Sequence, residues 1–277
     1  MTIIFDGREF VRRKNEETRR RVEDLIKKGV KPTLVSIFSP SDAGSALYTK
    51  IKKDAAQALG IQFRAKEIED AHDPDSIISE IEKINNDSKV HGILVQKPSG
   101  ENDFSKEDWS RIISTLSPKK DVDGLTPENL GLIDLGTPRF FPATAAAVLA
   151  ILEESKIVIR GSNVVIVGVS EILGKPLAAE LTERRATVTT THRGTRDLAG
   201  VIKRADILVS ATGTPNLIKG DMVKSGVVVI DVGAPKGDVL FQEVKDIASF
   251  ITPVPGGVGP VTVSCLLENT VLAAEEQ

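Results

Sequence analysis

The sequence contains little cysteine, histidine or aromatic side chain. Cys265 is the single cysteine among 277 residues, which excludes a disulfide within one chain and fits a cytosolic location. The histidines, His72, His91 and His192, are far apart in the sequence and do not have the spacing of metal ligands. Aromatic residues make up 4% of the chain. We therefore expect no metal centre and a core of aliphatic side chains.

Two further absences limit the partners that we expect. No apolar run is long enough to span a bilayer, and the first residues, MTIIFDGREFVRRK, carry charge too early for a signal peptide. The net charge is −3, so neither nucleic acid nor an anionic membrane is an expected partner. With 40% hydrophobic and 27% charged residues, the composition is that of a soluble globular protein.

Strand-like and helix-like patterns alternate along most of the chain. In the first half the predicted strands are 33–39, 61–68 and 91–96, and the predicted helices are 8–29, 41–59, 74–85 and about 103–115. Such alternation favours parallel sheets covered by helices on both faces. A further predicted helix at 142–155 marks the passage to a second domain.

The second half contains a complete strand–loop–helix–strand unit, NVVIVGVSEILGKPLAAELTERRATVTTTH. Two buried strands, in ADILVSATG and VVVIDVG, are predicted to follow it. This order is typical of a Rossmann-type nucleotide-binding domain. We predict an α/β protein with two domains.

The glycine loop GVSEILG, residues 168–174, stands where such domains bind phosphate, because helix N-terminal amides favour an anion. It has only the outer glycines of the GxGxxG pattern, so a plain strand-to-helix turn remains the alternative. The next strand ends in Thr190, Thr191, His192 and Arg193 without the carboxylate that binds the ribose of NAD. Arg193 can instead pair with a 2′-phosphate, which favours NADP over NAD.

The segment ITPVPGGVGPVT, residues 251–262, is half Gly and Pro. Proline fixes φ and glycine permits close backbone approach, so the segment is stiff and poor in side chains. It runs from the apolar stretch ASFI into a helical pattern, with Pro260 near the helix start. We expect its backbone to lie against a flat ligand; a tight structural turn is the alternative.

Tyr48 and Lys52 are four residues apart and share one face of a predicted helix. This Tyr-x-x-x-Lys pair also occurs in short-chain dehydrogenases, but there the glycine loop comes first. Gln96 ends a predicted strand, where it is either a cap or a ligand contact. Asp121 and Asp123 point in different directions if KKDVDGL is extended; the segment has too few acidic residues for a calcium loop.

Taken together, these segments resemble one family, the bifunctional methylenetetrahydrofolate dehydrogenase/cyclohydrolases. The matching segments, from Ser45 to Asn269, are Ser45 with YTKIK, GILVQ, KDVDGLTPENLG, GVSEILGKP, DVG at 231–233, and ITPVPGGVGPVT leading into LLENT. The resemblance implies NADP-dependent oxidation of 5,10-methylenetetrahydrofolate and hydrolysis of the methenyl product to 10-formyltetrahydrofolate. It also implies a homodimer, and the single cysteine favours a cytoplasmic location.

The resemblance implies roles for individual residues. Lys52 corresponds to the catalytic lysine, Tyr48 to the ring that stacks on the folate, and Gln96 to the amide that positions and tunes the lysine. Asp123 corresponds to the carboxylate that binds the donor-rich pterin edge. The implied backbone wall of the folate cleft is Pro255, Gly256, Gly257, Val258 and Gly259, and the implied dinucleotide contacts are Gly168, Val169, Ser170, Arg193 and Ala234.

The implied architecture is an N-terminal three-layer α/β domain and a C-terminal Rossmann-type NAD(P)-binding domain with an interdomain cleft. The folate-binding catalytic domain is predicted at 1–140 with the C-terminal helix 260–277, and the NAD(P)-binding domain at 141–259. Two segments depart from the family: VQKPSG replaces VQLPLP, and PATA replaces PCTP. These differences bear on the rim of the folate pocket and on the ratio of the two activities.

Three alternatives remain open. The first is a dehydrogenase of the same fold without hydrolase activity. The second is a nucleotide-binding regulator without catalysis, which has no need of a proton-transferring lysine. The third is a Rossmann dehydrogenase for another small substrate, such as a quinate-like acid, whereas the stiff Gly/Pro wall and Tyr48 favour a flat ring.

Overall fold

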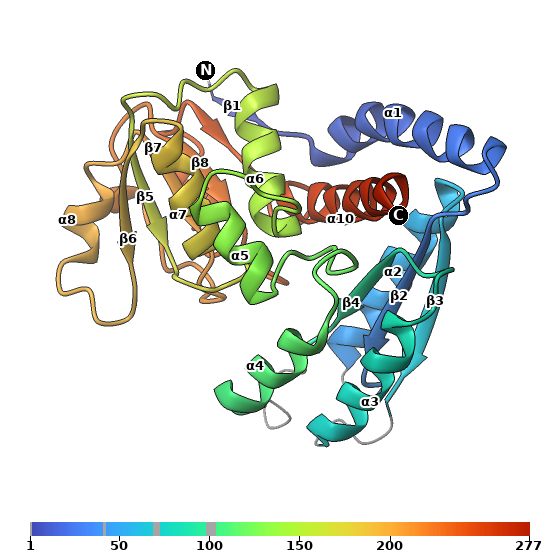
Figure 1. Cartoon of the computed structure of the whole chain (residues 1–277). Coiled ribbons are helices and arrows are strands. Elements are labelled where there is room, and N and C mark those ends of the chain that lie inside the picture. The colour runs from blue at the N-terminus through green and yellow to red at the C-terminus, as the bar shows by residue number, and fades with distance from the viewer. Residues whose placement is uncertain (1, 41–42, 69–72, 98–103) are drawn as a thin grey trace. The chain divides into compact units, whose positions relative to one another are not determined.

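The computed structural model describes residues 2–40, 43–68, 73–97 and 104–277, and it divides the chain into two compact units (Figure 1). Unit 1 comprises Met1–Arg13, Ile133–Thr137 and Pro142–Cys265. Unit 2 comprises Lys14–Leu132, Pro138–Phe141 and Leu266–Gln277. Each unit has its own parallel sheet, which confirms the predicted two-domain α/β class.

Unit 1 is built on a six-stranded parallel sheet with the strand order β1-β9-β8-β7-β5-β6. The strands are β1 (Ile3–Ile4), β5 (Asn163–Val167), β6 (Thr187–Thr191), β7 (Ile207–Ser210), β8 (Val228–Asp231) and β9 (Phe250–Ile251). The helices are α6 (Ala143–Glu154), α7 (Gly174–Glu183), α8 (Leu198–Ile202), the 3₁₀ helix η2 (Gly220–Met222), α9 (Phe241–Val244) and the first part of α10 (Val258–Glu276).

The order of these strands creates a switch point at the carboxyl edge of the sheet. From β5 the chain goes to β6 on one side and then crosses to β7, β8 and β9 on the other side. In open parallel sheets, ligands bind outside the carboxyl ends of the strands at such a point. The central strands are buried, whereas β1 and β6 at the two edges of the sheet are largely exposed. All four residues of β7 are buried, and apolar side chains of α8 and α9 complete this core.

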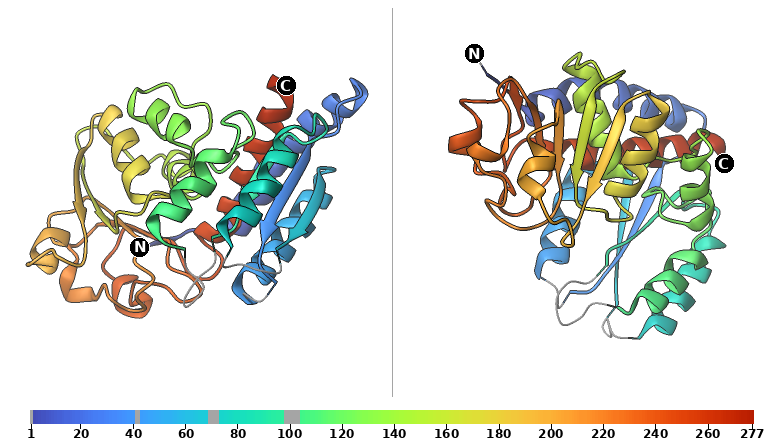
Figure 2. Two further views of the ribbon diagram at one scale, coloured as in Figure 1. Left: turned by 60° about the horizontal axis from the view of Figure 1, so that its bottom comes forward. Right: turned by 90° about the vertical axis from the view of Figure 1, so that its left-hand side faces the viewer.

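Unit 2 has a three-stranded parallel sheet with the order β3-β2-β4. Its elements are the main part of α1 (Gly7–Lys27), β2 (Thr33–Phe38), α2 (Ala43–Ala58), β3 (Gln62–Glu67), α3 (Pro74–Asn85), β4 (Gly92–Val95), α4 (Lys106–Thr115) and α5 (Pro127–Asp134). Apolar side chains of α3 and α4 pack with those of β2 and β4 in one core. The last part of α10 lies beside α1 (Figures 1 and 2), where Lys14 pairs with Glu268 at 2.7 Å.

Local signals explain why several elements begin where they do. Helix α3 spans the residues predicted for it, 74–85: Asp73 caps it by accepting the N–H of Asp75, and Pro74 occupies its first turn. Helix α4 begins at Lys106, because Ser105 is its N-cap and accepts the N–H of Asp108. The start of the helix predicted at 41 and the start of that predicted near 103 lie outside the described residues.

Helix α5 and strand β1 are among the elements that the sequence did not predict. Helix α5 was predicted as a polar connection, since its apolar periodicity is weak, and it follows a buried Thr126 whose hydroxyl accepts the N–H of Asn129. Strand β1 has only two residues and forms by pairing with β9, almost 250 positions later. In the part of the chain that the structure describes, no helix has the length and apolar character needed to cross a membrane.

Candidate active site

Lys52 and Gln96 form the centre of a polar cluster in unit 2. Lys52 lies on α2, and Gln96 directly follows the last residue of β4. The Lys52 ammonium nitrogen donates to the Gln96 carbonyl Oε1 at 3.3 Å. The amide nitrogen of Gln96 donates to the Ser36 hydroxyl at 3.4 Å and to the Thr49 hydroxyl. These contacts orient the amide so that its oxygen faces the lysine.

The electrostatics of this cluster suit a proton-transferring amine. Burial lowers the pKa of Lys52 from its usual value, and the nearby charge of Asp123 opposes part of that change. Desolvation penalises the ammonium form of a lysine, so the neutral form becomes accessible. An amine of this kind can take a proton as a base and return it as an acid.

The two aspartates of the KDVDG segment have separate surroundings. Asp121 is 1% exposed, and its Oδ2 accepts the N–H of Thr126 at 2.7 Å and the amide of Asn129 at 2.9 Å. Asp123 is only half-buried and acts electrostatically on Lys52. The first carboxylate therefore holds the turn, whereas the second is accessible to a ligand.

Tyr48 lies one helical turn before Lys52 on α2 and is 43% exposed. Ile51, on the same helix, is 44% exposed. An exposed ring beside an exposed aliphatic side chain offers an apolar surface to a flat ligand. Lys52, Gln96, Tyr48 and Asp123 thus belong to one unit, and the first two are in direct contact.

Gly168 stands at the switch point of unit 1, immediately after β5. Its φ is +116°, and a Cβ there would lie 2.4 Å from the carbonyl oxygen of Ala211, which follows β7. A Cβ on Gly174 would lie 2.0 Å from the carbonyl oxygen of Gly168. Both positions require glycine because the strand, the loop and α7 approach one another backbone to backbone.

The N-terminus of α7 has no side-chain cap. Its N-cap residue, Leu173, makes no side-chain cap hydrogen bond, and the N–H of Lys175 donates to the carbonyl oxygen of Ser170 at 3.1 Å. Val169 and Ser170, in the loop before it, are exposed. Helix N-terminal amides behind a glycine loop are a common phosphate-binding arrangement.

Arg193 and Ala234 follow other strands of the same parallel sheet. Arg193 is exposed two residues after the end of β6, and Ala234 is exposed three residues after the end of β8. No carboxylate occurs in the run from Thr190 to Arg193. All five residues predicted to contact the dinucleotide therefore follow carboxyl ends of strands in one sheet, the edge at which such ligands bind.

The Gly/Pro segment leaves β9 and enters α10, which begins at Val258. Gly256 has a φ of +102°, and a Cβ on Gly257 would lie 2.5 Å from the carbonyl oxygen of Pro253. Pro255 and Gly259 are exposed, whereas Gly257 and Val258 are buried. Part of the segment is thus packed backbone and part is open surface.

Gly7 supports this segment and was not foreseen from the sequence. Its N–H donates to the carbonyl oxygen of Gly256 at 3.0 Å, and a Cβ on Gly7 would lie 2.0 Å from that of Gly257. The only signal is its place at the start of α1, since the contact joins residues about 250 positions apart.

Two buried aspartates tie together the loops of the same edge in unit 1. The Asp231 carboxylate, at the end of β8, accepts three backbone N–H groups of the loop 233–239. Asp238 accepts the Ser210 hydroxyl at 2.9 Å and the N–H of Thr212 at 2.6 Å. Burial raises the pKa of Asp231. In the sequence, this role could have been predicted from the aspartate that ends the apolar strand VVVID.

Ser36 and Thr49 are also functional candidates that the sequence prediction missed. Ser36 is fully buried, at 0% exposure, in the otherwise apolar strand β2, and Thr49 is 5% exposed on α2. A buried hydroxyl generally has a hydrogen-bonding partner, and both contact Gln96. A polar residue inside TLVSIF could have indicated this.

The departure VQKPSG is described only up to Lys97, because residues 98–100 lie outside the described residues. The Lys97 ammonium lies 5.6 Å from the ring centroid of Trp109 on α4, a distance at which a cation is attracted to an aromatic face. The lysine in place of an apolar residue thus covers the single tryptophan of the chain.

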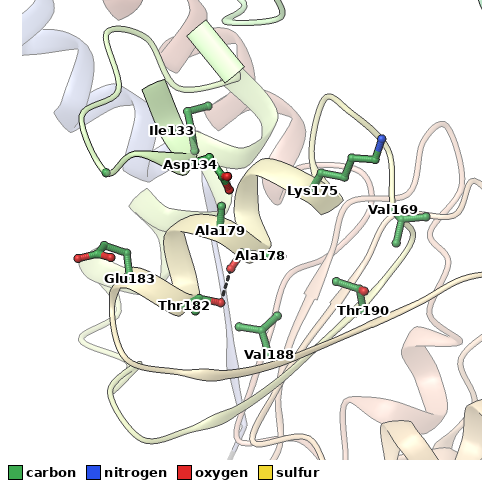
Figure 3. A pocket seen from close by; sticks show the side chains of 11 residues that line it. Ile133, Asp134, Val169, Lys175, Ala178, Ala179, Thr182, Glu183, Val188 and Thr190 are labelled. Carbon is green, nitrogen blue, oxygen red and sulfur yellow. Dashed lines mark hydrogen bonds between the residues drawn. The ribbon is translucent and has the colours of Figure 1, made fainter. Parts of the chain in front are cut away.

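A cavity of about 650 Å³ opens in unit 1 along α7 and β6 (Figure 3). Lys175 and Val169 lie toward one end of it and Glu183 toward the other, with Val188 and Thr190 of β6 beneath. Lys52, Gln96 and Asp123 are not among its lining residues. The convergent polar side chains of unit 2, and not this open groove, carry the arguments for proton transfer.

Two family models match the chain. Residues 5–123 match the tetrahydrofolate dehydrogenase/cyclohydrolase catalytic domain, and residues 142–277 match the NAD(P)-binding domain of the same family. Among curated proteins, the bifunctional protein FolD of Bacillus licheniformis is 41% identical over 279 residues, covering 98% of this chain and 97% of that protein.

Solved structures give the same result. The bifunctional enzyme FolD, a methylenetetrahydrofolate dehydrogenase/cyclohydrolase from Campylobacter jejuni, has a TM-score of 0.94 and 36% identity, covering 100% of this chain and 99% of that one. The FolD of Trypanosoma brucei, complexed with NADP cofactor and an inhibitor, has a TM-score of 0.93 and 35% identity, covering 99% and 98%.

Proposed function

The chain belongs to the tetrahydrofolate dehydrogenase/cyclohydrolase family, and on that premise we propose that it performs both reactions of the family. It oxidises 5,10-methylenetetrahydrofolate with NADP and hydrolyses the methenyl product to 10-formyltetrahydrofolate. The observation that carries the second activity is the half-buried Lys52 with its lowered pKa and its hydrogen bond to Gln96.

The oxidation needs placement more than it needs a base. NADP, when bound, accepts the hydride that leaves the one-carbon bridge. The protein has to bind the folate so that this carbon is presented correctly. In our proposal Tyr48 stacks on the flat folate and Asp123 accepts hydrogen bonds from the pterin edge, two roles that suit the exposed ring and the accessible carboxylate.

In our proposal Lys52 carries two of the proton transfers of the hydrolysis. Water adds to the methenyl carbon while the neutral amine of Lys52 takes one of its protons. The ring C–N bond then breaks, the nitrogen receives a proton from the Lys52 ammonium, the hydroxyl left by the water releases its own proton to solvent, and the carbon remains as a formyl group. Gln96 positions the amine through its carbonyl oxygen, 3.3 Å away.

We assign the folate chemistry to residues 1–140 with the helix 260–277, and cofactor binding to residues 141–259. Gly168, Val169, Ser170, Arg193 and Ala234 are the proposed dinucleotide contacts, and Pro255–Gly259 is the proposed backbone wall for the folate. The fit to a dinucleotide rests on Gly168, where a side chain would meet the Ala211 carbonyl at 2.4 Å. Arg193, after a strand end without a carboxylate, favours NADP.

One assay tests the function directly. The purified protein is mixed with methylenetetrahydrofolate and either NADP or NAD, and the methenyl absorbance is followed. We expect it to rise with NADP, less with NAD, and then to decay faster than without enzyme. No rise with either cofactor would contradict the proposal, and a rise without enzymatic decay would leave only the dehydrogenase.

The variant Gln96→Glu tests the tuning of the lysine. A carboxylate beside the ammonium favours the charged form, so the pKa of Lys52 should rise. Because the neutral amine is the base, the acidic limb of the hydrolysis profile should move to higher pH, and the rate at pH 7 should fall on the order of tenfold. The measurement is the hydrolysis rate of added methenyltetrahydrofolate against pH; an unmoved limb would remove Gln96 from this role.

We further propose that the protein is a cytoplasmic homodimer. A single cysteine in the sequence supports the cytoplasm. Strand β6 supports self-association, because it is the last strand of its sheet and its sequence, TVTTT, has no charge to discourage edge pairing. Light scattering should give about twice the chain mass of 29.8 kDa; the mass of one chain would refute the dimer.

A further inference from the structure

Asn269, on the part of α10 that belongs to unit 2, joins two backbone segments of that unit. Its amide nitrogen donates to the carbonyl oxygen of Val122 at 2.8 Å and to that of Phe141 at 3.0 Å. Val122 is the residue between Asp121 and Asp123. Asn269 thus holds the peptide that directly precedes the proposed folate-binding aspartate.

Further hydrogen bonds fix the segment 120–126, which contains Val122. The Asp121 carboxylate accepts the N–H of Thr126 at 2.7 Å and closes the turn. The N–H of Ile93, in β4, donates to the carbonyl oxygen of Lys120 at 2.7 Å. The segment therefore lies along the strand that ends just before Gln96.

The Val122 side chain adds a steric constraint. It is fully buried, and a Cβ on Gly92 would lie 2.8 Å from its Cγ1, so the valine packs directly on the backbone of β4. Its side chain is thereby fixed against β4, and its carbonyl is fixed by Asn269. With the peptide held at both ends, the backbone from which the Asp123 side chain projects has little freedom to shift.

We propose that Asn269 is a positioning residue for folate binding, which acts by holding the Val122 peptide and so the Asp123 carboxylate. The inference rests on the proposed function, because it takes Asp123 as the contact to the pterin edge. It also gives a role to the asparagine of LLENT, a segment that the proposed chemistry leaves without one.

Asparagine is suited to this task by its chemistry. One amide nitrogen carries two N–H donors in a plane, which matches two carbonyl acceptors from different segments. Alanine has no donor, aspartate would present acceptors to both carbonyls, and serine has a single donor on a shorter side chain. The Asn269 side chain is half-buried, so in its absence water can satisfy the two carbonyl oxygens only in part.

The experiment compares Asn269→Ala with Asn85→Ala. Asn85 is an equally half-buried amide of unit 2 that also makes two backbone bonds, donating to Thr115 O at 2.7 Å and accepting from Ser117 N at 3.0 Å. We expect Asn269→Ala to raise the KM for methylenetetrahydrofolate on the order of tenfold and to leave the KM for NADP unchanged. Asn85→Ala should lower the melting temperature similarly and leave both KM values at the wild-type level.

A double-mutant cycle with Asp123→Ala identifies the route of the effect. If Asn269 acts through Asp123, its removal should change the folate KM little once Asp123 is gone. A multiplied effect in the double variant, or a wild-type folate KM in Asn269→Ala, would overturn the inference. If Asn269→Ala does not fold, Asn269→Ser, which keeps one donor, serves in the same cycle.

The two proposals fail separately. If the wild-type protein does not oxidise methylenetetrahydrofolate, the proposed function fails. If the wild-type protein is active and Asp123→Ala raises its folate KM, but Asn269→Ala does not, only the positioning role fails.

Discussion

Replacing Lys52 with methionine should reduce the hydrolysis of methenyltetrahydrofolate by on the order of 10²- to 10⁴-fold, the usual contribution of a general acid–base group. Methionine fills a similar volume without an amine, so neither proton transfer has a carrier. Oxidation of methylenetetrahydrofolate should continue, because hydride transfer requires no base at this position. The methenyl absorbance should therefore rise with NADP and persist.

The loss of hydrolysis in Lys52→Met should not result from a lower folding stability. Burial lowers the pKa of Lys52, so the site disfavours its charged form, and an apolar side chain avoids that desolvation. The matched control is Lys53→Met: Lys53 is the next residue on α2 and is exposed. It should hydrolyse at the wild-type rate. A wild-type decay of the methenyl signal in Lys52→Met would disprove the assignment of the lysine.

Replacing Gly168 with alanine should impair the NADP-dependent oxidation and leave the hydrolysis of methenyltetrahydrofolate intact. The residue has a φ of +116°, and its new Cβ would lie 2.4 Å from the Ala211 carbonyl oxygen, a backbone atom that cannot rotate away. The loop before α7 must then shift, which withdraws the helix amides from the phosphates. We expect the affinity for NADP to fall at least about tenfold, equivalent to roughly 1.4 kcal/mol.

The control for this prediction is Gly161→Ala, which separates the effect of backbone strain at a positive φ from the effect of a steric clash of the new Cβ. Gly161 also has a left-handed φ, +77°, but a Cβ there would meet no atom within 4 Å. It should cost about 1–2 kcal/mol of unfolding free energy and leave NADP binding intact. A fluorescence titration with NADP measures both variants, and the melting temperature reports the strain. Equal affinities in Gly168→Ala and the wild type would show that the loop does not bind the cofactor.

The two variants should divide the activities in opposite ways. Gly168→Ala should still hydrolyse methenyltetrahydrofolate supplied directly, since Lys52 and Gln96 belong to the other compact unit. Lys52→Met should still reduce NADP. Because each variant should lose a different activity, the comparison can be made within one assay and does not depend on absolute rates.

Much of the fold was predictable from local pattern. Helix α3 begins directly after its capping residue Asp73, with Pro74 in its first turn, and β4 coincides with an apolar run of the sequence. The same local logic put Tyr48 and Lys52 one helical turn apart and Gln96 at a strand end. These features depend on the spacing of residues along a few turns or one strand, which a sequence displays directly.

Other features needed the folded chain. The two residues of β1 are too few to predict a strand and form one only against β9. Gly7 must be glycine because the carbonyl oxygen of Gly257 would lie 2.0 Å from its Cβ. The two aspartates of KDVDG look alike in sequence, yet one is buried and closes a turn while the other acts on Lys52.

The amino-acid sequence alone determined the two-domain α/β class, the family and the residue types needed for the chemistry, because patterning and motif order are properties of short segments. Tertiary structure decided the direction of the pKa shift of Lys52 and the geometry of those residues. Lys52 and Gln96 are 44 positions apart, and Asn269 is 147 positions from the carbonyl that it holds. Burial and hydrogen bonding across such separations arise only when distant segments pack, since a side chain's pKa and orientation depend on its surroundings in space.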